Sequence, residues 1–206
     1  MSKVVLITGA SSGIGKTIAE FLTLNNFKVY GTCRNPKNYP SISFELIKCD
    51  ILNNKDINST VDYIINKEKK IDVLINNVGI GITGPIEETK QEDVIQAFKT
   101  NFFGPLEITK KCIPCMRINR KGLIINITSV LAYFGNSYRG IYSATKSSME
   151  MIGETLNMEL KNFNINVVNI APGDFKTDII SRRIKPSLEK NSVYFDDYQD
   201  SIKKAN

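Results

Sequence analysis

The chain has 206 residues with a formal net charge of +6, and 42% of them are hydrophobic and 23% charged, which is the composition of an ordinary globular protein with a single domain over residues 1–206. The basic residues occur as scattered pairs with acids between them, so the charge indicates a solvated surface and argues against nucleic acid as a partner. Because the sequence contains no histidine, it excludes Ser-His-Asp catalysis and zinc sites with histidine ligands, and we expect no metal.

Short apolar runs rich in β-branched residues predict strands. They are residues 3–8, 28–33, 44–49, 71–76, 122–128 and 165–170. Between them, helical spacing occurs in segments such as the one with Ile18, Phe21 and Leu22 and the one over 143–162. This alternation predicts an α/β fold with a doubly wound (Rossmann) parallel sheet of at least six strands, in the order 3-2-1-4-5-6.

A glycine-rich turn, Thr8-Gly9-Ala10-Ser11-Ser12-Gly13-Ile14-Gly15, joins the first predicted strand to the first helix. Its three glycines allow a tight turn and a close approach of the backbone to a pyrophosphate, to which the helix N-terminus presents free N–H groups. The turn could also be merely a turn. A P-loop is excluded by the missing Gly-Lys-Ser/Thr ending.

The second predicted strand ends Thr32-Cys33-Arg34, with no acid. A carboxylate at this place would bind the ribose hydroxyls of NAD, whereas a guanidinium suits the 2′-phosphate of NADP. The alternative is an ordinary surface arginine. We therefore expect NADP (NADPH) as the cofactor in preference to NAD.

Polar or turn-forming residues stand at or just beyond the carboxyl ends of the predicted strands. They are Thr8, Arg34, Asp50, Asn76, Ser129 and Pro172. Doubly wound sheets bind their ligands at this edge. The sequence thus predicts that these segments form one site.

Tyr142 and Lys146 are four residues apart at the start of a predicted helix, so their side chains share a face. A tyrosine ordinarily titrates near about 10, and a nearby ammonium stabilises its phenolate for acid-base work. Such pairs are frequent on surface helices by chance. The pair gains weight from Ser129, which follows the fifth strand.

Together these motifs resemble the short-chain dehydrogenase/reductase family, in particular its NADP-preferring branch. The matches are the glycine turn at 8–15, Asn76-Asn77-Val78-Gly79, Asn101, Ser129, Tyr142-Ser143-Ala144-Thr145-Lys146, and Pro172-Gly173 followed by Thr177. They cover residues 1 to about 180. Val78 replaces the family's usual alanine, a small apolar change of little expected effect.

The resemblance implies an oxidoreductase that transfers a hydride between NADP(H) and an alcohol/ketone pair. Tyr142 would move the proton, Ser129 would hold the substrate oxygen, and Lys146 would bind the nicotinamide ribose and lower the tyrosine's pKa. Asn101 would hold a water of a proton relay, or else serve as a capping or kink residue. The cofactor-binding set would be Gly9, Ser11, Ser12, Gly13, Ile14, Gly15, Arg34, Asp50, Ile51, Asn77, Val78, Gly79, Tyr142, Lys146, Pro172, Gly173 and Thr177. The asparagines at 76 and 77 could equally stabilise the sheet.

Candidate substrate-pocket residues are apolar to aromatic, which favours a small apolar carbonyl or alcohol. They are Ile80, Ile82, Leu131, Tyr133, Tyr138 and Phe175. Residues from about 173 to 206 lose clear periodicity and are expected to be a loop-plus-helix region near the substrate.

Relatives usually continue to a seventh strand, which we expect to be missing here, leaving the sheet edge open. A neighbouring subunit could cover that edge, and many relatives assemble through the helices at roughly 91–118 and 143–162, so we expect a homo-oligomer, a dimer or tetramer. An alternative function is a cofactor-binding sensor or regulator of the same fold, with little or no turnover.

No apolar run approaches the roughly 20 residues that span a bilayer, and the amino-terminal residues lack the features of a secretion signal. We therefore expect no membrane partner and a cytoplasmic location. Cys112 and Cys115 have the spacing of a redox pair, but without a thioredoxin-like context buried packing is favoured.

Overall fold

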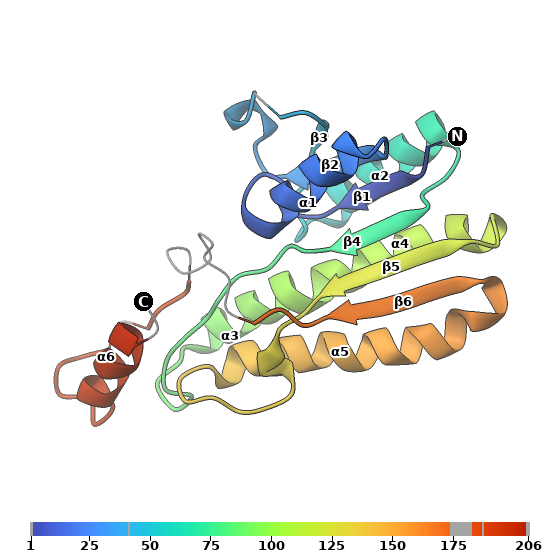
Figure 1. Ribbon diagram of the computed structural model, residues 1–206. Coiled ribbons are helices and arrows are strands. Elements are labelled where there is room, and N and C mark those ends of the chain that lie inside the picture. The colour runs from blue at the N-terminus through green and yellow to red at the C-terminus, as the bar shows by residue number, and fades with distance from the viewer. Residues whose placement is uncertain (1, 41, 174–182, 187, 205–206) are drawn as a thin grey trace.

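A parallel sheet forms the centre of the protein (Figure 1) in the computed structural model, which describes residues 2–40, 42–173, 183–186 and 188–204. Its strands are β1 (Val4–Ile7), β2 (Lys28–Cys33), β3 (Glu45–Lys48), β4 (Val73–Asn76), β5 (Gly122–Ile127) and β6 (Ile165–Ile170). In the described part of the chain their order is β3-β2-β1-β4-β5-β6, and each neighbouring pair is parallel. The predicted α/β fold and strand order are confirmed.

Helices connect the strands and cover the sheet. They are α1 (Gly13–Leu24), α2 (Asn54–Glu68), α3 (Gln91–Phe98), α4 (Gly104–Ile118), α5 (Gly140–Leu160) and α6 (Phe195–Lys204), with a π-helical turn at Lys99–Phe103 and 3₁₀ turns at Pro36–Asn38, Val130–Ala132 and Lys161–Phe163. After α1, Asn26 adopts a φ of 65°, a left-handed conformation that asparagine tolerates better than most residues. Within the described residues no helix is both long enough and apolar enough to cross a membrane.

The two faces of the sheet form separate cores, because successive side chains of a strand point to opposite sides. Val4 and Leu6 pack in one core with apolar residues of α2 and α4. Val5 and Ile7 pack in the other, with residues of α1. Cys112 is fully buried in the first core, where burial raises the pKa of its thiol. The structure thus agrees with packing rather than redox chemistry for this cysteine.

The edge strand β6 is only partly covered on the α1 side of the sheet. Val168 and Ile170 pair with Ile125 and Ile127 of β5, which belong to the α1-side core. Both β6 side chains remain nearly half exposed, at 45% and 46%. In the described residues β6 is therefore an edge strand with partly exposed apolar side chains.

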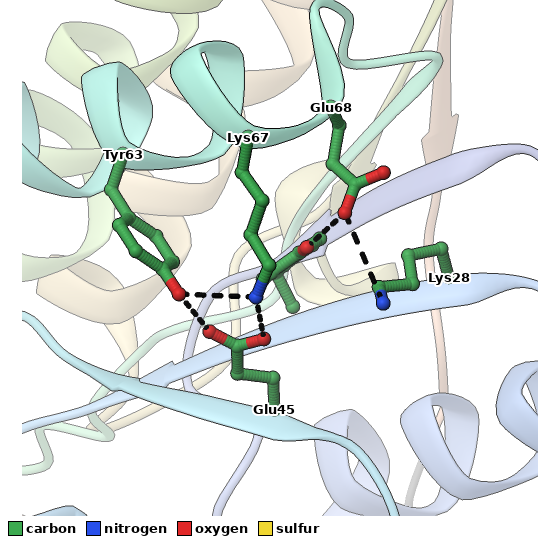
Figure 2. Close-up of polar contacts among 6 residues, drawn as sticks. Lys28, Glu45, Tyr63, Lys67 and Glu68 are labelled. Atoms are coloured by element: carbon green, nitrogen blue, oxygen red, sulfur yellow. Dashed lines mark hydrogen bonds and ion pairs between the residues drawn. The ribbon is translucent and has the colours of Figure 1, made fainter.

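A charged network links α2 to the amino-terminal parts of β2 and β3, away from the edge where the glycine turn lies. Its members are Lys28, Tyr30, Glu45, Tyr63, Lys67 and Glu68 (Figure 2). Lys67 Nζ lies 2.8 Å from Glu45 Oε2, and the Tyr63 hydroxyl donates to the same carboxylate at 2.6 Å. Burial and the Glu68 carboxylate raise the pKa of Tyr30. These contacts hold α2 against the sheet.

The C-terminal segment, here residues 183–186 and 188–204, lies beyond the carboxyl ends of β4, β5 and β6, where α6 is seen in Figure 1. Ile184 pairs with Ile82 in a parallel bridge. The Tyr198 hydroxyl lies 2.8 Å from that of Thr83, and the Tyr198 ring contacts that of Tyr138 with centroids 5.3 Å apart. The segment is thereby fixed to the loops after β4 and β5, next to the predicted site.

Candidate active site

The turn between β1 and α1 requires glycine at the positions that the sequence indicates. Gly9 and Gly13 have φ angles of 67° and 54°, a left-handed region that side chains rarely adopt. Gly15 is constrained by space instead, because a methyl group there would lie 2.3 Å from Asn77 Nδ2 and 2.5 Å from the Gly9 carbonyl oxygen. The turn is therefore both tight and closely packed.

Asn77, which follows β4, and Thr8, which follows β1, hold this turn in place through hydrogen bonds. Asn77 Nδ2 donates to the carbonyls of Thr8 and Gly9 at 2.9 and 3.1 Å. The Thr8 hydroxyl accepts the N–H groups of Asn77 and Val78 at 3.0 and 3.1 Å. Asn76 Nδ2 donates to Thr109 Oγ1 and Asn126 Oδ1. Both asparagine side chains are therefore engaged in hydrogen bonds within the protein. This favours the structural alternative for the two asparagine side chains.

The backbone at the N-terminus of α1 fits a pyrophosphate. The first turn of α1 holds no acidic side chain, and Ser11, Ser12 and Ile14 are partly buried around it. Any side chain at Gly15 would fill the space against Gly9 and Asn77. A glycine cradle at a helix N-terminus is suited to an anion, so the residues present fit a dinucleotide.

The remaining residues proposed for the cofactor lie at the carboxyl ends of other strands. Arg34 is exposed directly after β2, and Ile51 is 8% exposed after β3. Asp50 Oδ1 accepts the N–H of Leu52 at 3.0 Å. Pro172, after β6, accepts the N–H of Val130 through its carbonyl at 3.0 Å, and the neighbouring Gly173 is exposed. Thr177 and the pocket candidate Phe175 lie outside the described residues.

Ser129, Tyr142 and Lys146 come together between β5 and α5. Ser129 acts on the Tyr142 hydroxyl and lowers its pKa. Lys146 Nζ lies 5.8 Å from the centroid of the Tyr142 ring. A methyl group at Gly79 would lie 3.6 Å from the same Nζ, which places the lysine beside the Asn77-Val78-Gly79 loop. The three side chains therefore lie near one another.

The pKa of the Tyr142 hydroxyl is raised, whereas the family resemblance implies that Lys146 lowers it. Burial raises the pKa of its hydroxyl above the ordinary value, while the Ser129 hydrogen bond and the guanidinium groups of Arg183 and Arg139 act in the opposite direction. Lys146 Nζ donates to the Ile127 carbonyl at 2.8 Å and lies over the Tyr142 ring, and it is not among the groups that lower this pKa.

Lys146 is itself strongly perturbed. It is 5% exposed, and burial lowers the pKa of its amine to about 8, with the Glu150 carboxylate acting in the opposite direction. An ammonium that titrates near neutral pH in a closed site is typical of functional positions.

Asn101 lies in the π-helical turn between α3 and α4 and is 1% exposed. Its Oδ1 accepts the Ile80 N–H at 2.8 Å, and its Nδ2 donates to the Ile80 carbonyl at 2.9 Å and to Thr145 Oγ1 at 3.1 Å. Single π-turns are frequent at functional sites. Asn101 therefore joins the loop after β4 to the helix that carries Tyr142 and Lys146.

The substrate side of the site is only partly as the sequence suggests. Ile82 is 2% exposed, and its backbone pairs with Ile184. Tyr138 contacts the ring of Tyr198, whereas Tyr133 is 64% exposed. Ile80 and Leu131 are partly buried.

Three charged residues near the site were not anticipated. They are Arg139, Glu150 and Arg183. The position of Glu150, four residues after Lys146, could have indicated a shared helix face. Arg183 reaches the site through the bridge beside Ile82, and a tertiary contact of this kind leaves no local signal.

Comparisons with known proteins agree with this geometry. Residues 3–187 match the family model described as short chain dehydrogenase. The chain is 39% identical over 203 residues to the 3-ketodihydrosphingosine reductase of Bacteroides thetaiotaomicron, an alignment that covers 98% of this chain and 75% of that protein. The crystal structure of a short-chain dehydrogenase from Streptomyces avermitilis superposes with a TM-score of 0.86 at 29% identity, over 99% of this chain and 76% of the other. ElxO with NADP bound superposes with a TM-score of 0.81 at 29% identity, over 86% of this chain and 76% of ElxO.

Proposed function

This chain belongs to the short-chain dehydrogenase family, and we propose that it reduces a carbonyl compound with NADPH, or oxidises the corresponding alcohol with NADP. The observation that carries the proposal is the cluster of Ser129, Tyr142 and Lys146, in which the serine lowers the pKa of the tyrosine hydroxyl and the buried lysine lies over the tyrosine ring. This is an acid-base group at the same sheet edge as the glycine cradle.

The cofactor would be held by the turn at Gly9, Gly13 and Gly15 and by the N–H groups that open α1. When bound, its nicotinamide ring supplies the hydride for reduction. Lys146 would bind the nicotinamide ribose, and its Nζ lies next to Gly79, 3.6 Å from the position of a Cβ there.

Tyr142 would donate its proton to the substrate oxygen. Its raised pKa keeps the hydroxyl protonated at neutral pH, which is the form that reduction needs. Ser129 would donate a hydrogen bond to the same oxygen as negative charge develops on it. Lys146 would return a proton to Tyr142 by way of a water, which Asn101 would hold in place; Asn101 is itself fixed by bonds to the Ile80 backbone and to Thr145 on the helix that carries both groups.

The preference for NADP is supported by Arg34, whose exposed guanidinium follows β2 at the carboxyl edge of the sheet. A planar, permanently charged group can bind a phosphate through two parallel hydrogen bonds. ElxO, a structural relative, is known with NADP bound.

The substrate class that we propose is an apolar ketone or aldehyde. Ile80, Leu131 and Tyr133 flank the catalytic cluster and carry no charge. The name of the Bacteroides relative denotes the reduction of a keto compound, which supports the same direction.

A dimer or tetramer would bury apolar side chains that the outer surfaces of α4 and α5 expose. Met151 and Met158, seven residues apart on α5, are 63% and 71% exposed, and Ile118 at the end of α4 is 83% exposed. Light scattering on the eluted protein would give the mass of the assembly, and a monomeric mass would reject this part of the proposal.

The function is tested by following NADPH oxidation across a panel of ketones and aldehydes, with Tyr142→Phe measured in parallel. We expect at least one substrate to be turned over, and the variant to lose about three orders of magnitude or more in kcat while still binding NADPH. A protein that binds NADPH but turns over no carbonyl compound would instead be the sensor or regulator considered above.

A further inference from the structure

Glu150 is a buried carboxylate that the proposed chemistry does not use. It lies on α5 one turn after Lys146 and two turns after Tyr142, and it is 6% exposed. Placing a carboxylate in the interior is costly unless it is hydrogen-bonded and balanced by charge. The environment of Glu150 should therefore reveal what it does.

Close packing of α5 on β6 brings Glu150 to the end of the sheet. A methyl group at Gly153 would lie 2.1 Å from Asn169 Oδ1, so a side chain at this point would have to displace the Asn169 amide. Asn169 Nδ2 then donates to the backbone carbonyl of Glu150 at 2.9 Å. This bond fixes the helical turn that carries the carboxylate.

The side chain of Glu150 contacts the chain segment that carries Ser129. The Thr128 hydroxyl donates to Glu150 Oε1, and the Glu150 carboxylate raises the pKa of the Tyr133 hydroxyl. Thr128 stands between Ile127, whose carbonyl accepts Lys146 Nζ, and Ser129. Through Thr128, Glu150 is thus linked to the segment that contains both Ser129 and the Ile127 carbonyl that Lys146 contacts.

Among the described residues, Lys146 lies near mostly uncharged groups. They include the Tyr142 ring on its own helix, the Ile127 carbonyl on β5, and Gly79 in the loop after β4. Arg139 and Arg183 act on Tyr142. Burial drives Lys146 toward its neutral form, and Glu150 supplies the opposing negative charge.

We propose that Glu150 is a positioning residue, whose buried carboxylate lies one helical turn from Lys146, holds the Thr128–Ser129 segment against α5 and balances the charge of the buried ammonium. The purpose of this arrangement rests on the proposed function, because a neutral lysine could not assist Tyr142 in proton transfer. The arrangement itself does not depend on turnover.

A purely structural role makes a different prediction from an electrostatic one. Thr128 Oγ1 also lies 3.0 Å from the Ile170 carbonyl, and a hydroxyl has one proton to donate. If Glu150 were a neutral acid, it could donate to Thr128, which would donate to Ile170, and glutamine could replace it without changing any charge. The two roles are separated by measuring the charge on Lys146.

The experiment is a titration of the Lys146 side chain by its ¹³Cε chemical shift in the cofactor-free protein, with the signal assigned by its loss in Lys146→Arg. In the wild type the amine should titrate with a pKa of about 8. In Glu150→Gln we expect the midpoint to move lower by about one pH unit, because an attractive charge has been removed from a dry environment. Glu154→Gln is the matched control, since Glu154 is on the same helix but exposed, and its midpoint should stay unchanged.

An unchanged Lys146 midpoint in folded Glu150→Gln would overturn the proposal. Should that variant fail to fold, the ¹³Cδ shift of Glu150 in the wild type at pH 7 decides instead, because a carboxylate signal supports the proposal and a protonated acid refutes it. Neither readout needs a substrate. A shifted midpoint in a protein without carbonyl reductase activity would therefore reject the proposed function and leave the role of Glu150 intact.

Discussion

Replacement of Gly15 by alanine should damage both the fold and cofactor binding, although alanine is ordinarily the better helix former. The added methyl group would lie 2.3 Å from Asn77 Nδ2 and 2.5 Å from the Gly9 carbonyl oxygen, well inside the roughly 3.5 Å contact distance of carbon atoms. Asn77 cannot move away freely, because the same Nδ2 bonds the carbonyls of Thr8 and Gly9.

The size of the effect follows from these contacts. Overpacking of a closely packed site costs about 1–3 kcal/mol, and each of the two hydrogen bonds of Asn77 contributes about 1 kcal/mol. The higher helix propensity of alanine offsets about 1 kcal/mol. We expect the free energy of unfolding to fall by about 3 kcal/mol. The displaced turn should also lose at least one N–H bond to the pyrophosphate, which weakens NADPH binding about tenfold.

Urea unfolding measures the free energy of unfolding, and a fluorescence titration with NADPH measures the affinity for the cofactor. Gly135→Ala is the matched control, because a methyl group at Gly135 meets no atom within 4 Å and should change stability by less than about 0.5 kcal/mol. If Gly15→Ala were as stable as the control and bound NADPH with wild-type affinity, the close approach of turn and loop described above would be incorrect.

Two further predictions concern the cofactor and the pH dependence. Arg34→Glu should reverse the preference from NADPH to NADH, because a carboxylate repels the 2′-phosphate and accepts ribose hydroxyls; kcat/KM with both cofactors measures this, and an unchanged ratio would show that Arg34 is an ordinary surface residue. The kcat/KM for reduction, which reports ionisation of the free enzyme, should be constant at low pH and decline as pH rises through about 8, because the pKa of Lys146 is lowered to about 8 and only its ammonium form is active. A profile that stays flat to pH 10 would contradict the role of that ammonium.

The sheet and the glycine turn could be predicted because their signals are local. The limits of β2 and β6 agree residue for residue with the segments predicted at 28–33 and 165–170, since β-branched and aromatic residues favour strands. Gly9 and Gly13 carry the positive φ angles that such a turn requires.

What escaped the sequence depends on tertiary contacts. Burial raises the pKa of Tyr142, while Ser129 and the guanidinium groups of Arg183 and Arg139 lower it. The balance of these effects cannot be judged from the spacing of a Tyr-Lys pair. Glu150 reads as an ordinary solvated helix residue until the packing at Gly153 is known. Asn77 could equally have faced a ligand, and only the geometry reveals that it braces the turn.

The most direct measurement is the transfer of deuterium from NADPH labelled at the nicotinamide C4 position to a carbonyl substrate found in the panel, followed by mass spectrometry of the alcohol. The account predicts that the wild-type protein delivers the label to the product carbon, and that Tyr142→Phe, although it binds the labelled cofactor, delivers almost none. Wild-type protein that binds the cofactor and yields no labelled alcohol, or a phenylalanine variant as fast as the wild type, would contradict it.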